Sequence, residues 1–311
     1  MTESSVRYAQ MCKLADGSDF GLYIHEFVGS VGDGPTLGIC GLIHGNEVAG
    51  AYIACDLARK LREMAFKGRV SILPIANPQG FAENERFTTI DRVNLNRVFP
   101  GDPAGSFAHQ LAHHITREFF TGLDAFVDLH TGTDRPTVDY TYVLNDEGLS
   151  RASGSNYLYR SQEEFIGSST CATLKMGIPS VVIEIGGGTV DQAPYVDRGV
   201  AAVVNMMRYL DMLEEDPVER PHQTILTDIQ LVFPSQGGIL ETEAPPLGEK
   251  IKGGDVLGRI VSPYTFDELE VMRSPVENGV MILSHLVRNV VQPGDYAYMI
   301  GDLDSREAPS S

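Results

Sequence analysis

The chain has 311 residues and carries 42 aspartates and glutamates against 24 lysines and arginines, a formal net charge of −18 at pH 7. Phosphate binding needs clustered basic side chains, so this charge argues against nucleic acid as a partner, and also against an anionic membrane surface. Acidity spread along a whole chain mostly keeps a protein soluble and only faintly favours a cationic substrate. With 42% hydrophobic residues, the chain can bury a large core in one large domain or two smaller ones.

Four cysteines lie far apart in the sequence without a CxxC pair: Cys12, Cys40, Cys55 and Cys171. Such a long, cysteine-poor chain is not a disulfide scaffold, so we expect reduced thiols and a cytoplasmic location. The first eight residues are polar and lack the apolar segment of a signal peptide. No apolar run approaches the length that spans a bilayer.

The first two thirds of the chain alternate short apolar strands with helices. Apolar runs predict strands over 36–40, 70–76, 125–129 and 180–185, and helical spacing predicts helices over 47–62, 107–119 and 200–213. This alternation predicts an α/β fold with a mainly parallel sheet and helices on both of its faces. The polar segment 80–105 has little regular period, and a loop of that length is usually functional or disordered.

The pattern changes after Glu214. The charged, proline-bearing segment 214–223 is typical of a linker, and the residues from 224 to 302 contain short strands between glycine turns without a convincing helix. We therefore predict a catalytic domain over residues 1–215 and a small all-β domain over residues 216–311. The predicted strands of the β domain are 230–233, 238–243, 256–261, 268–273, 279–283 and 296–300.

Two of the predicted strands lead into residues that bind metals. His44 lies in the turn after strand 36–40, Glu47 lies in the first turn of the following helix, and His130 follows strand 125–129. In open α/β sheets, ligands bind beyond the carboxyl ends of the strands. Two histidines and one glutamate, with a fourth position left for water, form a catalytic rather than a structural zinc set. We therefore predict one zinc ion per chain, held by His44, Glu47 and His130.

Chance can produce each part of this set. A lone HxxE pattern occurs often without a metal, and a lone histidine after a strand is usually a hydrogen-bonded surface residue. Taken together, at strand ends and beside glycines that permit a close approach of the backbone, the three residues favour a metal site.

Glu184 lies inside the apolar run 181–185 and is followed by three glycines. A carboxylate in an apolar strand is costly unless it is paired or functional. Burial raises its pKa toward the working pH, which suits a general base. A structural salt bridge is the alternative, and the glycines favour the general base.

The polar loop concentrates arginines and asparagines in the segment ERFTTIDRVNLNRVFPG at 85–101. Arginine binds a carboxylate through two hydrogen bonds and can also stabilise a developing oxyanion. For Asn96 and Arg97 we favour binding of a substrate carboxylate over a structural role.

Five motifs in the same order resemble the succinylglutamate desuccinylase/aspartoacylase family, which is related to the zinc carboxypeptidases. They are HGNE at 44–47, NPQG at 77–80, DRVNLNRVFPG at 91–101, DLHTG at 128–132 and IEIGGG at 183–188, within residues 36–215. The resemblance implies a zinc carboxypeptidase-like catalytic domain, with zinc on His44, Glu47 and His130 and with Glu184 as the general base.

The resemblance also implies roles for residues that contact the substrate. Asn96 and Arg97 would bind the substrate carboxylate, and Arg86 would polarise the scissile carbonyl group. Aspartoacylases use a further arginine shortly before the catalytic glutamate. This chain has Lys175 in that stretch, and we expect this lysine to stand in as a substrate-binding residue.

The β domain resembles the C-terminal domain that narrows the active-site mouth in this family. It also resembles a biotinyl/lipoyl carrier, through DELEVMRSP at 267–275 and VQPGD at 291–295. Carriers need a lysine where this chain has Arg273. We therefore expect a carrier-like fold that caps the active site and has no carrier function.

Together these features predict a zinc-dependent amidohydrolase, a deacylase that cleaves the amide bond of a small N-acyl amino acid such as an N-succinyl- or N-acetyl-amino acid. Glu184 would take the proton of the attacking water and later deliver it to the leaving amine, and Arg86 would help to hold the oxyanion.

Two other functions compete with this one. A zinc metallocarboxypeptidase acting on short peptides would use the same metal ligands and base, but a capping β domain favours smaller substrates. A binding module without turnover is the alternative outside enzymes, and the presence of every ligand and of the base argues against it. The sequence leaves open the acyl group, the amino acid and the oligomeric state, a homo-oligomer included.

Overall fold

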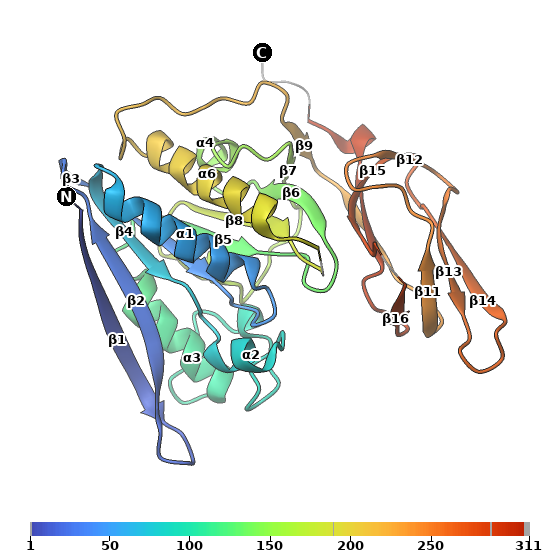
Figure 1. The fold of residues 1–311 in the computed structure, drawn as a ribbon, viewed down its shortest axis with the longest axis horizontal. Coiled ribbons are helices and arrows are strands. Elements are labelled where there is room, and N and C mark those ends of the chain that lie inside the picture. The colour runs from blue at the N-terminus through green and yellow to red at the C-terminus, as the bar shows by residue number, and fades with distance from the viewer. Residues whose placement is uncertain (1, 189, 287, 308–311) are drawn as a thin grey trace.

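The computed structural model describes residues 2–188, 190–286 and 288–307. Within this part of the chain, thirteen strands form one large sheet, whose first strands lie in the order β1-β2-β4-β3-β5-β8-β6. Figure 1 shows helices packed against this sheet and the C-terminal strands at the right of the molecule. The strands before residue 190 are β1 (Glu3–Lys13), β2 (Asp19–Val28), β3 (Gly32–Gly41), β4 (Lys67–Leu73), β5 (Ala125–His130), β6 (Thr137–Tyr142), β7 (Tyr157–Tyr159) and β8 (Ser180–Gly186).

The large sheet contains both parallel and antiparallel pairs of strands. The prediction of a mainly parallel sheet is therefore wrong for the strands outside its centre. The four predicted strands β4, β3, β5 and β8 do run parallel. However, β1 and β2 form an antiparallel hairpin that pairs with β4, and β6 runs antiparallel to β8. The hairpin was not predicted: β1 is exposed along most of its length and has no apolar run, whereas β2 does have the alternation of a half-buried strand.

Helices cover both faces of the sheet, as predicted. One face packs against α1, α4 and α6, and the other packs against α3 and α5. The helical segments are α1 (Ala49–Glu63), α2 (Pro78–Glu83), the 3-10 helix η1 (Leu95–Arg97), α3 (Phe107–Ile115), the π-helix η2 (Thr116–Phe120), α4 (Glu147–Arg151), α5 (Ser169–Lys175) and α6 (Ala193–Tyr209). Each helix in the described part of the chain is too short or too polar to span a lipid bilayer.

Alternation along the central strands decides which face receives the functional side chains. Val127 and Leu129 of β5 lie in the core beneath α1 and α6, and Phe126 lies in the core on the side of α3. Because successive residues of a strand point to opposite faces, Asp128 and His130 share the face of Phe126. The same rule places Glu184 on that face of β8.

The residues after 224 form strands, as predicted, and the 3-10 helix η3 (Leu303–Ser305). The strands β14, β13, β11 and β16 form a separate four-stranded sheet. The others extend the large sheet, since β15 pairs with β6 and β9 pairs with β7. The bounds are β9 (Thr224–Leu226), β10 (Ile229–Val232), β11 (Gly238–Thr242), β12 (Lys250–Lys252), β13 (Val256–Val261), β14 (Glu268–Arg273), β15 (Asn278–Ser284), β16 (Asn289–Val291) and β17 (Tyr298–Asp302).

A hydrophobic cluster joins the C-terminal strands to the rest of the chain. Ile282 of β15 and Leu226 of β9 are buried together with Tyr140 of β6. A shared core of this kind couples the stability of the two parts, because neither can separate without exposing apolar surface. The division of the chain at 215/216 therefore stays a prediction.

Replacement of Ile282 by alanine should destabilise the whole chain. Ile282 is fully buried, and truncation of a buried isoleucine lowers the free energy of unfolding by about 2–5 kcal/mol. Urea unfolding followed by far-UV circular dichroism and tyrosine fluorescence measures this loss. Leu231→Ala, at an exposed position of β10, is the control and should change the free energy by about 0.5 kcal/mol or less. Two separate transitions, of which Ile282→Ala moves only one, would contradict the shared core.

Candidate active site

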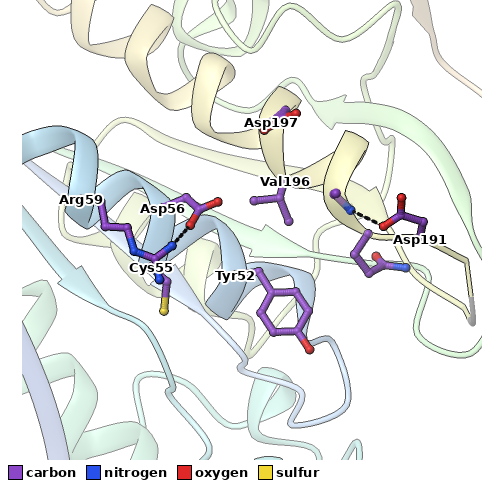
Figure 2. A pocket seen from close by; sticks show the side chains of 9 residues that line it. Tyr52, Cys55, Asp56, Arg59, Asp191, Val196 and Asp197 are labelled. Atoms are coloured by element: carbon purple, nitrogen blue, oxygen red, sulfur yellow. Dashed lines mark hydrogen bonds and ion pairs between the residues drawn. The ribbon is translucent and has the colours of Figure 1, made fainter.

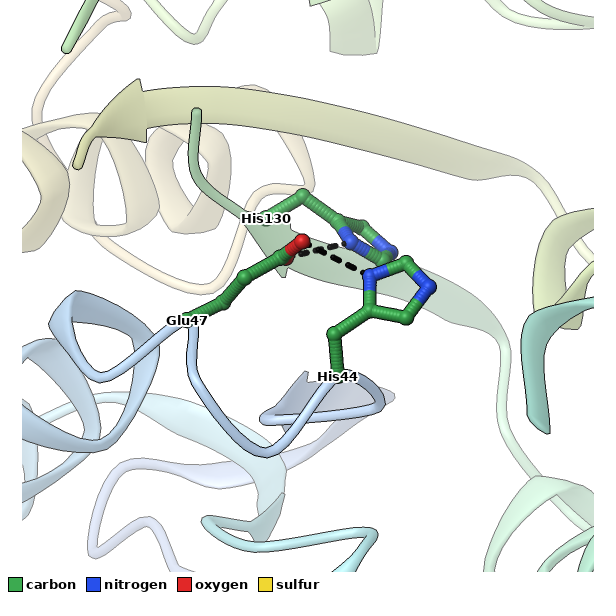
Figure 3. Close-up of side chains that lie close together, drawn as sticks. All are labelled: His44, Glu47 and His130. Atoms are coloured by element: carbon green, nitrogen blue, oxygen red, sulfur yellow. Dashed lines mark hydrogen bonds and ion pairs between the residues drawn. The ribbon is translucent and has the colours of Figure 1, made fainter. Parts of the chain in front are cut away.

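Two segments that are distant in the sequence, the HGNE turn after β3 and the end of β5, bring His44, Glu47 and His130 together. One ligand atom from each residue lies within 4.8 Å of the others. Figure 3 shows both imidazole rings turned toward the Glu47 carboxylate. All three side chains are buried, with exposed fractions of 3%, 2% and 4%. The structure therefore places the three predicted metal ligands in one cluster.

The turn that carries His44 depends on a close approach of two backbones. A Cβ atom on Gly45 would lie 2.0 Å from the carbonyl carbon of Gly80, so the HGNE turn lies directly against the NPQG turn. Asn77 begins α2 and accepts the Gly80 N–H at 3.1 Å, which fixes the second turn. Only glycine at position 45 allows this contact. The two motifs thus form one structural unit behind the metal ligands.

The Glu47 carboxylate accepts hydrogen bonds from several parts of the chain. His44 Nδ1 lies 2.7 Å from Oε1, and His130 Nδ1 lies 2.8 Å from Oε2. The main-chain N–H of Thr131 donates to Oε2 at 3.2 Å, and Arg86 donates to Oε1 at 2.8 Å. The predicted role of Arg86 at the scissile carbonyl stays a prediction, but its guanidinium group does lie at the site.

The outer nitrogen of each imidazole is held by an oxygen acceptor. His130 Nε2 lies 3.0 Å from Asp128 Oδ2, and His44 Nε2 lies 3.1 Å from Asn94 Oδ1. A carboxylate and an amide oxygen can only accept, so each Nε2 carries the proton. Each Nδ1 faces the Glu47 carboxylate, so a metal ion bound between them would take the place of any proton there. Two imidazole nitrogens and one carboxylate oxygen, with outer acceptors behind the imidazoles, are the donor set and supporting contacts of a catalytic zinc site.

The electrostatics of the cluster also favour a bound cation. Burial alone would raise the pKa of Glu47, but the two neighbouring imidazoles hold this pKa well below its usual value. Burial alone would lower the pKa of His130, but the Asp128 and Glu47 carboxylates raise it well above its usual value. Two buried carboxylates against the same imidazole stabilise positive charge between them, whether a proton or a metal ion supplies it.

Glu184 lies next to the cluster on the neighbouring strand. The register of β5 and β8 pairs His130 with Glu184, and the register of β8 and β6 pairs Glu184 with Tyr140. Burial is the largest influence on Glu184 and raises its pKa to about 8, with a smaller rise from Glu47 and opposing effects of His130 and Arg86. A buried carboxyl group with this pKa can exchange a proton near neutral pH.

Asn96 and Arg97 lie in η1 beside the cluster. Asn96 is buried, and its Nδ2 atom lies 3.4 Å from His130 Nε2. Arg97 donates to the main-chain oxygen of Asn96 at 2.7 Å and is exposed. Lys175 is the last residue of α5, and it is exposed. No hydrogen bond or ion pair of the described residues joins Lys175 to the cluster, so the structure gives its predicted role no support.

Three residues with direct contacts at the site were not predicted from the sequence. Asn94 and Asp128 hold the outer nitrogens of the histidines, and Ser169 donates to Asp128. Asp128 could have been found by the argument used for Glu184, because it is also a carboxylate in an apolar strand. Asn94 and Ser169 carry no such signal, because polar residues in loops and at helix starts are common.

Apart from the histidine–glutamate cluster, a pocket of about 560 Å³, here called the hollow, lies between α1 and the start of α6 (Figure 2). Its polar groups already bind one another: Arg59 pairs with Asp56, and Asp191 accepts the N–H of Ala193. None of the predicted site residues lines it. The hollow is therefore separate from the histidine–glutamate cluster.

Comparison with known proteins agrees with this geometry. The family model of the succinylglutamate desuccinylase/aspartoacylase catalytic domain matches residues 33–210, which is more than half of the chain. The chain belongs to the succinylglutamate desuccinylase/aspartoacylase family. The resemblance drawn from the five motifs is thus confirmed, and the matched residues contain all three predicted metal ligands and Glu184.

Several relatives resemble the chain over most of its length. The N-alpha-acetyl-L-2,4-diaminobutyric acid deacetylase of Halomonas elongata is 29% identical over 249 residues, which cover 74% of this chain and 71% of the relative. A succinylglutamate desuccinylase from Silicibacter sp. has a TM-score of 0.84 at 26% identity, covering 98% of this chain and 95% of the other. The product-bound ectoine utilization protein EutE of Ruegeria pomeroyi has a TM-score of 0.83 at 24% identity and covers 96% and 95% of the two chains. At that identity the last likeness shows the fold alone.

Removal of a histidine from the cluster should remove the metal. We expect elemental analysis of gently purified protein to find one equivalent of zinc per chain, and His44→Ala or His130→Ala to lose most of it. His109→Ala is the control, because this histidine is bonded to Ser106 on α3, outside the cluster. Full metal occupancy in both cluster variants would contradict the metal site.

Proposed function

We propose that the protein is a zinc-dependent deacylase that hydrolyses the amide bond of a small N-acyl amino acid. The observation that carries this proposal is the buried cluster of His44, Glu47 and His130, with the carboxyl group of Glu184 on the adjacent strand. The family of the chain supports the deacylase activity, and the donor set supports zinc.

A zinc ion in this donor set would supply Lewis acidity, which polarises a carbonyl group and lowers the pKa of water. The remaining steps belong to the chain itself. Glu184 accepts the proton of the attacking water and then donates it to the nitrogen of the leaving amine. Because burial raises its pKa toward neutrality, the same group can act first as base and then as acid. The products are a carboxylate and a free amino acid.

Arginine side chains provide the positive charge that the substrate requires. Asn96 lies beside His130, and Arg97 donates to the main-chain oxygen of Asn96; in this proposal both bind the α-carboxylate of the amino acid. Arg86 already donates to Glu47, and its partly exposed guanidinium group retains further N–H donors for the developing oxyanion. A second carboxylate on the acyl group, as in a succinyl group, would need another cation, and the N-alpha-acetyl substrate in the name of the Halomonas elongata relative supports acetyl over succinyl.

A group of aromatic side chains continues the site beyond Glu184; we call Tyr140, Tyr142, Tyr159 and Phe165 the aromatic wall. The ring of Tyr142 lies 5.6 Å from that of Tyr140, 5.4 Å from that of Tyr159 and 5.5 Å from that of Phe165. Tyr140 is the register partner of Glu184. The wall therefore lies on the same face of the sheet as the base.

The charges near Tyr142 indicate what the aromatic wall contacts. Burial and then Glu184 raise the pKa of the Tyr142 hydroxyl, whereas Arg97 lowers it. The Tyr142 hydroxyl is thus influenced both by Glu184, the proposed base, and by Arg97, the proposed ligand of the substrate carboxylate. We propose that the wall receives the side chain of the amino acid, and that this side chain is cationic, because aromatic rings attract ammonium groups. The diaminobutyric acid deacetylase of Halomonas elongata supports an N-acetylated diamino acid as the substrate.

The C-terminal strands support a small substrate over a peptide. They contact the segment that follows His130: Thr137 donates to the main-chain oxygen of Ile282 at 3.0 Å, and Ser284 donates to that of Pro136 at 3.4 Å. We propose that the β domain, residues 216–311, narrows access to the site in this way. A metallocarboxypeptidase acting on peptides would need a more open approach. The cytoplasmic location and a homo-oligomer stay predictions.

Carrier function is not part of the proposal. Arg273 occupies the position at which a carrier has its modified lysine, and its guanidinium group donates to the main-chain oxygen of Gly254 at 2.9 Å. An arginine cannot accept a biotinyl or lipoyl group, so the resemblance concerns the fold only.

Glu184→Gln should lose turnover and keep its metal. The amide is nearly isosteric with the carboxyl group but cannot accept a proton, and general-base catalysis contributes about two to four orders of magnitude to kcat. Wild-type kcat/KM should rise with pH as Glu184 loses its proton, and the residual activity of the variant should lack this acidic limb. The positive charge of a bound zinc ion would lower the pKa of Glu184. The acidic limb of the pH profile should therefore lie below pH 8, because the pKa of Glu184 is about 8 without the metal.

The control for this experiment is Asp139→Asn. Asp139 lies on β6 and pairs with Arg198 away from the cluster, so the variant should keep kcat and the pH profile within a few-fold. Steady-state kinetics of amine release from N-acetyl-diaminobutyrate, together with zinc analysis, measure both variants. A Glu184→Gln enzyme with near wild-type kcat would mean that another group is the base.

Arg97→Ala should weaken recognition of the substrate carboxylate. Loss of a charge-assisted hydrogen bond costs roughly 1.5–3 kcal/mol, which is about a ten- to hundredfold loss in kcat/KM. The loss should disappear for a substrate whose α-carboxylate is converted to an amide. Arg92→Ala, an exposed arginine of the same loop that faces Glu85, is the matched control. If the ratio of kcat/KM for the acid to kcat/KM for the amide is the same in wild type and in Arg97→Ala, Arg97 does not bind the α-carboxylate.

A further inference from the structure

Asp128 holds His130 through a carboxylate whose two oxygens differ in their contacts. The residue is fully buried. Its Oδ2 atom accepts from His130 Nε2 at 3.0 Å and from the hydroxyl of Ser169. Its Oδ1 atom has no hydrogen-bond partner among the residues that the structure describes. The direction of the carboxylate therefore depends on Ser169 as well as on His130.

Ser169 makes a second contact with the site through its main chain. It is the first residue of α5, where the N–H groups have no partner inside the helix. Its N–H donates to Asn96 Oδ1 at 2.9 Å. Because Oδ1 is engaged there, the amide Nδ2 of Asn96 faces His130.

The hydroxyl of Ser169 is not needed to begin the helix. Ser168 is the N-cap residue, and its side chain accepts the N–H of Cys171 at 3.0 Å. That contact is the usual capping hydrogen bond. Ser169 is itself fully buried and directs its hydroxyl at Asp128. A buried hydroxyl without a capping role, bonded to the carboxylate behind a metal ligand, indicates a role in the site.

We propose that Ser169 is a positioning residue that links the metal ligand to the substrate ligand. Its hydroxyl fixes Asp128 behind His130, and its main-chain N–H fixes the amide of Asn96. Acceptors behind a metal-bound histidine set the orientation and basicity of its ring, so the hydroxyl acts on metal affinity. The inference rests on the proposed function, because it concerns the proposed roles of His130 and Asn96.

Ser169→Ala separates the two contacts, because it removes the hydroxyl and keeps the main-chain N–H. Loss of a direct acceptor behind a ligand usually weakens metal binding about 10- to 100-fold. The hydroxyl acts through Asp128, so we expect a smaller loss of zinc affinity, roughly three- to tenfold. With zinc at saturation, KM should stay within about twofold of wild type, because the N–H that orients Asn96 is intact. Competition with a chelator of known affinity measures the first quantity, and amine-release kinetics measure the second.

Ser150→Ala is the matched control. Ser150 is also a fully buried helical serine, and its hydroxyl donates to the main-chain oxygen of Asp146 at 2.9 Å. This variant loses a buried hydrogen bond of similar kind without a contact to the site, so its zinc affinity should equal that of wild type. An equal loss of affinity in Ser150→Ala and Ser169→Ala would reduce the effect to general destabilisation and overturn the proposal.

A double-mutant cycle tests whether Ser169 acts through Asp128. In an Asp128→Ala background, the Ser169→Ala change should weaken zinc binding no further, because the group that transmits its effect is gone. Additive losses in the double variant would contradict the linkage. If Ser169→Ala folds poorly, Ser169→Cys replaces it: a thiol of similar shape is a weaker donor, and its zinc affinity should fall between those of wild type and Asp128→Ala.

The zinc measurement also separates this inference from the proposed function. It needs no substrate, so an inactive protein with the expected order of zinc affinities would reject the deacylase and retain the positioning role. Conversely, an active deacylase in which wild type, Ser169→Ala and Ser169→Cys bind zinc equally would reject the positioning role and retain the enzyme.

Discussion

The buried carboxylate of Glu47 is the group on which the arrangement of the site depends. It accepts from Arg86 and from the main-chain N–H of Thr131, and the Nδ1 atoms of His44 and His130 lie within 2.8 Å of it. A buried carboxylate that loses its partners costs several kcal/mol. The segments that supply these donors must therefore adopt their native positions together. The metal ligands are assembled by the same interactions that stabilise the centre of the fold, and a bound metal ion would add to an existing arrangement.

The sheet extends this arrangement from the metal ligands to the base. His130, Glu184 and Tyr140 are register partners across three adjacent strands, so one row of side chains leads from the predicted metal ligand to the proposed base and to the aromatic wall. The side chains on the opposite face of the same strands, such as Val127 and Ile183, are buried beneath α1 and α6. A one-residue slip of β8 would bury Glu184 in that apolar core and expose apolar residues at the site, so the core fixes the register that places Glu184 beside His130.

The sequence predicted the parts of the molecule that have strong local signals. The parallel strands were found because they are continuous apolar runs, and His44, His130 and Glu184 were found because they interrupt or end such runs. The hairpin of β1 and β2 was missed because β1 is exposed along most of its length, although the alternation of Phe20, Leu22 and Ile24 in β2 is itself the pattern of a strand. Asn94 and Ser169 were missed for a different reason. Their contacts with the site join residues that are many positions apart, and no local pattern distinguishes them from other polar residues at turns.

The aromatic wall shows a second way in which the C-terminal strands can influence specificity, besides the proposed narrowing of access to the site. Tyr140 is buried in the same cluster as Ile282 and Leu226, and Tyr142 and Tyr159 pack against this cluster. The positions of the three tyrosines therefore depend on residues after 224, although the tyrosines themselves precede the predicted domain boundary. The shape of the proposed side-chain pocket is then a joint property of both parts of the chain. Substitutions in the buried face of β15 would alter substrate binding by moving Tyr140. No residue of β15 belongs to the histidine–glutamate cluster or to the proposed catalytic residues.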